Sequence, residues 1–138
     1  MKNTGIRFFV LSILSLSIFS CTGQKANTEA SNTFKDVSVE QASTMMQENR
    51  NLLVLDVRTP GEVAEGKIKG ATVIDFQGAT FSATIDQLDK EQAVLVYCAA
   101  GGRSGKTMEM MKAKGFKEVY NMTGGFTAWT AAGKSVEK

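Results

Sequence analysis

Residues 93–104 read AVLVYCAAGGRS, and this stretch decides the fold. The unbroken apolar run from Ala93 to Cys98 is typical of a strand that is covered on both faces of a parallel sheet. A short turn containing glycine follows, and helix formers then continue to Lys114, where Gly115 predicts the end of the helix. A buried strand, a tight turn and a helix in direct succession predict an α/β protein whose functional site lies at the carboxyl ends of its strands.

The sequence on both sides of this stretch continues the alternation of strands and helices. Short apolar runs predict further strands at 51–57, 71–76 and 118–121, with an edge strand at 34–37. Between the strands at 34–37 and 51–57, Ser38 is expected to cap a helix in which apolar residues recur at spacings of three and four. The whole pattern predicts a small α/β sandwich with a mainly parallel sheet.

The first 20 residues have the pattern of an export signal. Lys2 and Arg7 precede an uncharged apolar run that is shorter than the roughly 20 residues a membrane span needs. The residues immediately before Cys21 resemble a bacterial lipobox, so Cys21 is expected to be the lipidated first residue of the mature protein. An ordinary cleaved signal and an uncleaved membrane anchor are the alternatives. We therefore expect an exported protein anchored by lipid in the cell envelope, either facing the periplasm or at the outer membrane.

The remaining chain divides into a tether and one domain. Residues 21–33 are small and polar, which predicts a flexible segment, and residues 34–138 are long enough to form one core. Without Lys2 and Arg7, 14 basic residues balance 14 acidic ones. This balance gives no electrostatic reason to expect nucleic acid as a partner. The domain is expected to be a monomer.

Composition excludes several kinds of active site. The chain contains no histidine, so catalytic triads that use an imidazole and metal sites with histidine ligands are excluded. Its two cysteines, Cys21 and Cys98, do not form a C-x-x-C motif, and neither a metal nor another cofactor is expected.

Cys98 lies where an ionised thiol would be stabilised. Gly101 and Gly102 allow backbone N–H groups to turn inward, the following helix adds the positive end of its dipole, and Arg103 adds a full charge. These three features predict a lowered pKa and a nucleophilic thiolate. The alternative is a buried structural cysteine at the end of a strand.

Three motifs in order resemble the rhodanese-like sulfurtransferases. Residues 52–71 (LLVLDVRTPGEVAEGKIKGA) are similar to the family's first signature, 96–106 (VYCAAGGRSGK) to its active-site loop, and 115–129 (GFKEVYNMTGGFTAW) to its closing motif. The resemblance implies a three-layer sandwich with a five-stranded, mainly parallel sheet flanked by helices. Four residues separate Cys98 from Arg103, which matches the loop of sulfurtransferases and is one residue shorter than that of related phosphatases and arsenate-handling enzymes.

The resemblance also implies roles for individual residues. Cys98 would be the nucleophile that carries sulfur as a persulfide, and Arg103 a cation at the mouth of the loop or a brace for it. Substrate would be bound by the loop residues Ala99, Ala100, Gly101, Gly102 and Ser104, while Asp56 and Arg58 would give structural support. The implied reaction moves sulfane sulfur from thiosulfate or a persulfide to a small thiol, to cyanide, or to a protein thiol.

Four positions depart from the family pattern and affect the expected donor. Lys67 stands where a histidine is usual, Val63 replaces a frequent aromatic residue, and Ala99 and Ala100 supply no basic or hydroxyl side chain. A dianionic donor would meet only Arg103 and backbone dipoles, so a neutral persulfide or polysulfide rivals thiosulfate.

Two other functions remain open from the sequence. A rhodanese-like fold can serve as a binding module without transferring sulfur. Residues 100–107 (AGGRSGKT) also match a relaxed phosphate-loop pattern with alanine in place of the first glycine, which would indicate a nucleotide-binding protein.

Overall fold

The protein is described by a computed structural model that covers residues 32–138. The predicted signal at 1–20, the lipidation site Cys21 and the tether as far as residue 31 lie outside the described residues and stay predictions. β1 begins at Thr33, one residue before the predicted start of the domain. The elements in chain order are β1 (Thr33–Val37), α1 (Val39–Glu48), β2 (Leu53–Asp56), α2 (Pro60–Ala64), β3 (Lys67–Ile68), β4 (Thr72–Val73), α3 (Phe81–Asp86), β5 (Val94–Tyr97), α4 (Gly102–Ala113), β6 (Glu118–Met122), α5 (Gly125–Ala131) and β7 (Val136–Glu137).

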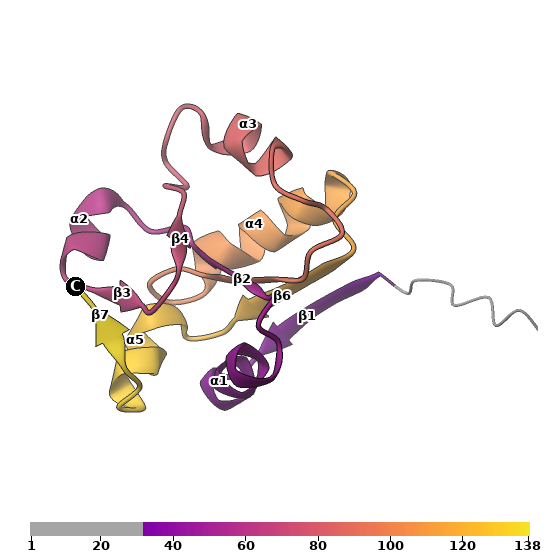
Figure 1. Ribbon diagram of the computed structural model, residues 1–138. Coiled ribbons are helices and arrows are strands. Elements are labelled where there is room, and N and C mark those ends of the chain that lie inside the picture. Colours follow the sequence, from indigo (N-terminus) through magenta and orange to yellow (C-terminus); the bar gives the residue numbers. More distant parts are fainter. Residues whose placement is uncertain (1–31) are drawn as a thin grey trace, which may run out of the picture.

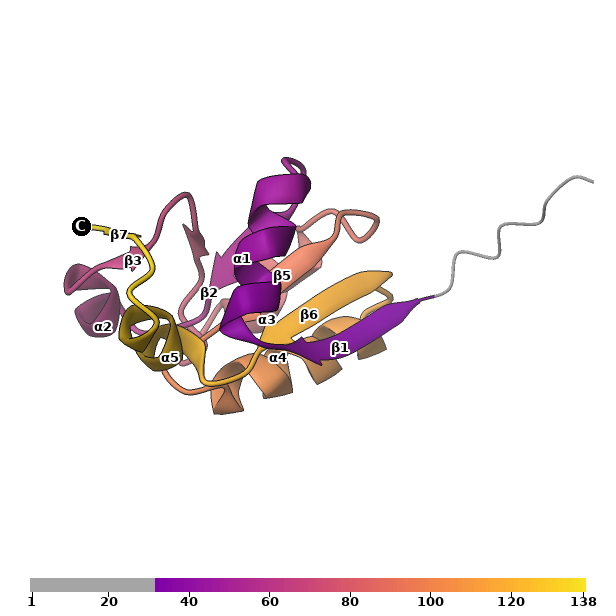
Figure 2. The same ribbon diagram turned by 90° about the horizontal axis from the view of Figure 1, so that it is seen from below.

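Five strands form one sheet in the order β1-β6-β5-β2-β4, and each neighbouring pair is parallel (Figure 1). Helices α1 and α5 pack on one face, and α3 and α4 pack on the other. Figure 2 shows α1 and α4 on opposite sides of the sheet. The predicted α/β sandwich with a five-stranded parallel sheet is therefore confirmed. β5, which carries the sequence into Cys98, lies in the middle of the sheet between β2 and β6.

The side chains of β5 explain why its sequence is apolar without a break. Val94 and Val96 belong to the core under α3 and α4, whereas Leu95 and Tyr97 belong to the core under α1 and α5. Successive side chains of a strand point to opposite faces, so a strand with a helix layer on each side needs apolar residues at every position.

The first helix begins as its sequence predicts. The Ser38 hydroxyl accepts a hydrogen bond from the Gln41 N–H (3.2 Å), and the Gln41 side chain accepts one from the Ser38 N–H (2.8 Å). This reciprocal pair satisfies two backbone donors that a helix start otherwise leaves free. Val39 and Ala42 are buried against the sheet.

The strand predicted at 71–76 is shorter in the structure. β4 covers only Thr72–Val73, although the Ile74 N–H still bonds to the Asp56 carbonyl (2.9 Å) and the Phe76 N–H to the Val57 carbonyl (3.3 Å). The chain thus stays beside the end of β2 without strand geometry.

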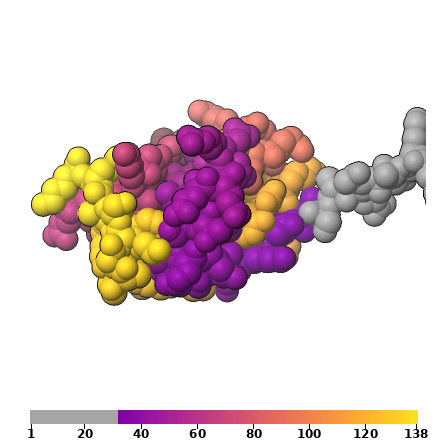
Figure 3. Space-filling model, turned by 60° about the horizontal axis from the view of Figure 1, so that its bottom comes forward, coloured from indigo at the N-terminus to yellow at the C-terminus, as the bar shows by residue number. Residues whose placement is uncertain are grey.

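The short elements α3, α5, β3 and β7 were not predicted, because each is held by contacts with distant parts of the chain. Strands β3 and β7 pair in antiparallel fashion. The C-terminal segment that carries β7 lies beside α1 (Figure 3), where the Lys134 ammonium donates to the Ser43 hydroxyl (3.4 Å).

Candidate active site

Cys98 follows β5 directly, at the carboxyl edge of the sheet where the sequence predicts the site. Gly101 precedes α4 with a φ of +99°, a left-handed conformation that favours glycine, and α4 begins at Gly102. The loop therefore folds the N-terminal end of a 12-residue helix back over the cysteine. The partial positive charge at a helix N-terminus favours an ionised thiol.

The Cys98 sulfur is enclosed by hydrogen-bond donors. The Gly101 N–H donates to Sγ at 3.1 Å, the Ser104 hydroxyl lies 3.5 Å from Sγ, and the residue is only 2% exposed. Burial by itself raises the pKa of the Cys98 thiol, but the Ser104 hydroxyl and the N–H groups of Ser104, Ala100 and Gly101 outweigh it and lower that pKa. The arrangement therefore stabilises a thiolate, through the Ser104 hydroxyl and the backbone of the predicted loop.

Ser104 belongs to a polar chain that sequence reasoning missed. Its hydroxyl lies 2.6 Å from Asn121 Oδ1, and Asn121 Nδ2 donates to the Asp36 carboxylate at 2.8 Å. Asn121 is 5% exposed and Ser104 is fully buried. The signal was present in the sequence, because an asparagine inside an apolar strand needs a buried partner.

Arg103 is paired with an acidic residue of α2. Its Nη1 and Nη2 donate to the two carboxylate oxygens of Glu62, at 2.8 and 2.6 Å. Glu62 also accepts hydrogen bonds from the N–H and hydroxyl of Thr59, as the capping box of α2. Nothing in the sequence predicts this contact, which joins residues 41 positions apart.

The turn before α5 packs directly against the active loop. The Phe126 N–H donates to the Cys98 carbonyl (2.8 Å) and the Thr127 N–H to the Ala99 carbonyl (3.0 Å). Gly124 and Gly125 both have positive φ, as a tight turn requires. Ala99 thus contributes its backbone to the support of the loop, while Ala100 and Gly102 are exposed at its tip.

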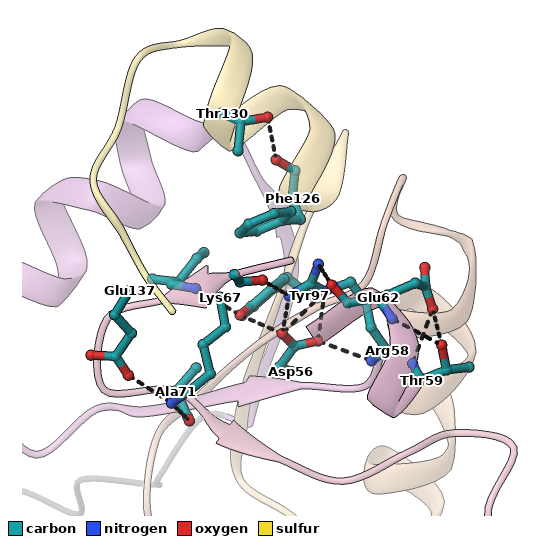
Figure 4. A network of polar contacts seen from close by, with 12 residues as sticks. Asp56, Arg58, Thr59, Glu62, Lys67, Ala71, Tyr97, Phe126, Thr130 and Glu137 are labelled. Atoms are coloured by element: carbon teal, nitrogen blue, oxygen red, sulfur yellow. Dashed lines mark hydrogen bonds and ion pairs between the residues drawn. The ribbon is translucent and has the colours of Figure 1, made fainter. Parts of the chain in front are cut away.

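Asp56 and Arg58 form a buried network beside the loop (Figure 4). The Arg58 guanidinium lies 2.7 Å from the Asp56 carboxylate, which also accepts a hydrogen bond from the Tyr97 hydroxyl at 2.6 Å. The same guanidinium lies 3.9 Å from the ring centroid of Phe126, in cation–π geometry. The network connects the ends of β2 and β5 to the start of α5.

The sequence is similar to known proteins of one family. The family model for the rhodanese-like domain matches residues 38–132. The chain belongs to the rhodanese-like family. It is 28% identical to a sulfurtransferase of Allochromatium vinosum over 98 residues, which are 71% of this chain and 90% of that protein. It is 33% identical to the thiosulfate sulfurtransferase GlpE of Coxiella burnetii, again over 98 residues, or 71% of this chain and 89% of that one.

A solved structure of a protein from the same family has a similar fold. A crystal structure of a rhodanese-like domain protein from Staphylococcus aureus superposes with a TM-score of 0.65 at 28% identity, over 75% of this chain and 99% of that one. The resemblance of the three sequence motifs to rhodanese-like proteins is confirmed.

The rhodanese-like loop is poorly arranged for the phosphate-loop alternative. Thr107, which would bind a magnesium ion, is buried, and its hydroxyl donates to the Arg103 carbonyl at 2.9 Å. Asp56, which ends the apolar strand β2 and would be the acidic ligand of that ion, is also buried and is paired with Arg58 and Tyr97. Both side chains have structural partners, so neither is free to hold the metal of a nucleotide.

We expect Ser104→Ala to raise the pKa of the Cys98 thiol, because the variant removes a hydroxyl that lies 3.5 Å from Sγ and lowers the pKa of that thiol, although it shares its one proton with Asn121 Oδ1. The midpoint of the pH profile of alkylation by iodoacetamide should then lie at a higher pH than in the original protein. At neutral pH the variant should be alkylated about threefold more slowly than the original. Thr107→Val is the matched control, since it removes another buried hydroxyl of α4 that donates to a carbonyl. If both variants give the same alkylation profile, the Ser104 hydroxyl does not stabilise the thiolate.

Proposed function

We propose that this protein is a sulfurtransferase that carries sulfane sulfur as a persulfide on Cys98. The observation that carries the proposal is the Cys98 sulfur itself, held at the start of α4 by the Gly101 N–H (3.1 Å) and the Ser104 hydroxyl (3.5 Å). A thiolate in such a cradle is a ready nucleophile. Family membership and the relatives named as sulfurtransferases support the reaction class.

The reaction proceeds in two displacements. The Cys98 thiolate attacks the outer sulfur of the donor, the bond from that sulfur to the rest of the donor breaks, and the leaving group departs with the electron pair. An acceptor, either a thiolate or cyanide, then attacks the outer sulfur of the Cys98 persulfide and regenerates the thiolate. The loop holds the ionised cysteine, so the first step needs no separate base.

The backbone of the loop gives the persulfide its support. The N–H groups of Ala100, Gly101 and Ser104 favour negative charge on the Cys98 sulfur. When the charge moves to the outer sulfur of the persulfide, the same donors and the dipole of α4 remain beside it. The partners of the protein are then a small sulfur donor and a thiol or cyanide acceptor, with a protein thiol as a further acceptor.

Intact mass spectrometry tests the proposal. The purified protein is measured before and after incubation with thiosulfate or with an organic persulfide, beside Cys98→Ser. We expect a gain of one sulfur atom that cyanide removes and that the variant lacks. Absence of a gain with every donor would overturn the proposal and leave a binding module as the function of the fold.

A further inference from the structure

The charge of the active loop itself is compensated. Arg103 is the only charged residue between Cys98 and Ser104, and its guanidinium is joined to the Glu62 carboxylate by two hydrogen bonds. The Glu62 and Arg103 side chains are 33% and 23% exposed, which places the pair at the edge of the loop rather than deep in the core. A donor that approaches the loop therefore meets an ion pair of zero net charge.

Two neighbouring cations are compensated in the same way. Arg58 is buried against Asp56, and the ammonium of Lys67 lies 2.7 Å from the Glu137 carboxylate (Figure 4). Lys67 also donates to the Ala71 carbonyl at 2.8 Å. Neither cation is therefore available to replace the charge that Glu62 cancels on Arg103.

Glu62 is held in place for this role. Its carboxylate accepts hydrogen bonds from the Thr59 N–H (3.0 Å) and the Thr59 hydroxyl (2.9 Å), in addition to those from Arg103. The hydrogen bond from Arg103 and those from Thr59 lower the pKa of Glu62 to about 2, although burial opposes them. Glu62 is therefore ionised at neutral pH, and Arg103 is neutralised whenever a donor arrives.

The loop itself favours an organic donor of low charge. Ala99 is partly buried and Ala100 is exposed, so the loop presents methyl groups rather than basic or hydroxyl side chains at these positions. Thiosulfate carries two negative charges toward a thiolate and has no apolar group to place there. An organic persulfide of the form RSSH brings less charge and can contact apolar side chains.

We propose that Glu62 is a specificity-determining residue, which cancels the charge of Arg103 and so makes organic persulfides better donors than thiosulfate. The inference rests on the proposed function. In the persulfide reaction the Cys98 thiolate bonds to the outer sulfur of RSSH, the S–S bond of the donor breaks, and RS⁻ leaves with the electron pair. The products are the Cys98 persulfide and a thiol, so no oxidant or reductant is consumed.

Glu62→Gln tests this inference, because glutamine keeps an oxygen acceptor for Thr59 and Arg103 but removes the charge. The measurement is kcat/KM for thiosulfate and for the persulfide of 2-mercaptoethanol, with cyanide as acceptor. We expect the original protein to prefer the persulfide, and the variant to raise kcat/KM for thiosulfate about five- to tenfold relative to that for the persulfide. The gain should shrink at high salt.

Two further variants test whether the shift in donor preference comes from the loss of Glu62 in particular, rather than from any loss of negative charge, and whether it can still be tested if Glu62→Gln does not fold. Glu65→Gln removes an exposed carboxylate at the end of the same helix and should leave the ratio of the two donors unchanged. Ala100→Lys adds an uncompensated cation at an exposed position of the loop and should shift the ratio toward thiosulfate, even if Glu62→Gln fails to fold.

The outcomes distinguish the inference from the proposed function. If the original protein prefers thiosulfate, if folded Glu62→Gln leaves the ratio within twofold of the original, or if Ala100→Lys leaves it unchanged where Glu62→Gln does not fold, the inference is wrong while sulfur transfer stands. If Cys98 accepts sulfur from neither donor, the proposed function itself fails.

Discussion

Replacing Gly125 with alanine is expected to lower the free energy of unfolding by about 2 to 4 kcal/mol, from overpacking and from a left-handed backbone that disfavours alanine. A Cβ at this position would lie 2.3 Å from the Cys98 carbonyl oxygen and 2.7 Å from the carbonyl group of Ala99. These are backbone atoms of the active loop and cannot rotate away as a side chain would. The Gly125 φ of +56° adds strain whatever space is made.

The clash should also disturb the loop. Relief requires the turn before α5 to move away from Cys98, which would lengthen the hydrogen bond from the Phe126 N–H to the Cys98 carbonyl. We therefore expect slower loading of sulfur onto Cys98 as well as a lower midpoint of urea denaturation.

Gly133→Ala is the matched control for this prediction. Gly133 also has a positive φ, +67°, but nothing lies within 4 Å of the position its Cβ would take. The control should lose only about 1 kcal/mol, the cost of the backbone conformation alone. If both variants lose the same free energy of unfolding, the clash with the active loop contributes nothing to the loss in Gly125→Ala.

The elements that sequence reasoning found are those that local patterns determine. The apolar run of β5 and the capping of α1 by Ser38 each depend on neighbours within a few residues. The position of Cys98 between a buried strand and a helix follows from the same local patterns. This is why the loop and its nucleophile could be located without a structure.

The interactions that the sequence did not reveal join distant positions. Glu62 meets Arg103 across 41 residues, and Asn121 meets Asp36 across 85. Each of these side chains also has a local interpretation, as a cap or a strand residue, and a single sequence does not favour the distant partner. The neutralisation of Arg103 by Glu62 therefore could not be predicted from the sequence, because it depends on the contact between α2 and α4 in the folded protein.

Asp56→Ala is expected to lower the free energy of unfolding by about 3 to 5 kcal/mol, because it leaves a buried cation without its partner. Arg58 is 2% exposed, and its guanidinium would keep only the carbonyls of Gly66 (2.8 Å) and Glu62 (3.2 Å) as acceptors. The Tyr97 hydroxyl would lose its own acceptor as well. Urea denaturation of the variant measures the loss.

The chain offers a matched control with the same substitution. Asp86 forms an ion pair with Lys114 at 2.6 Å, but its side chain is 48% exposed. Asp86→Ala should therefore cost less than about 1 kcal/mol, as exposed ion pairs usually do. If the two variants lose the same free energy, burial does not set the cost of breaking the Asp56–Arg58 pair.

A double variant decides between charge and shape as the source of the loss. Asp56→Ala combined with Arg58→Met removes the carboxylate and the guanidinium together, so no unpaired charge remains in the core. If the unpaired charge dominates, the double variant should be more stable than Asp56→Ala alone, although it has lost more hydrogen bonds. If the double variant is the less stable of the two, Arg58 stabilises this end of the sheet mainly by packing on Phe126 and by its bonds to the backbone around α2. The first outcome would mean that Asp56 is required chiefly because Arg58 is buried beside it.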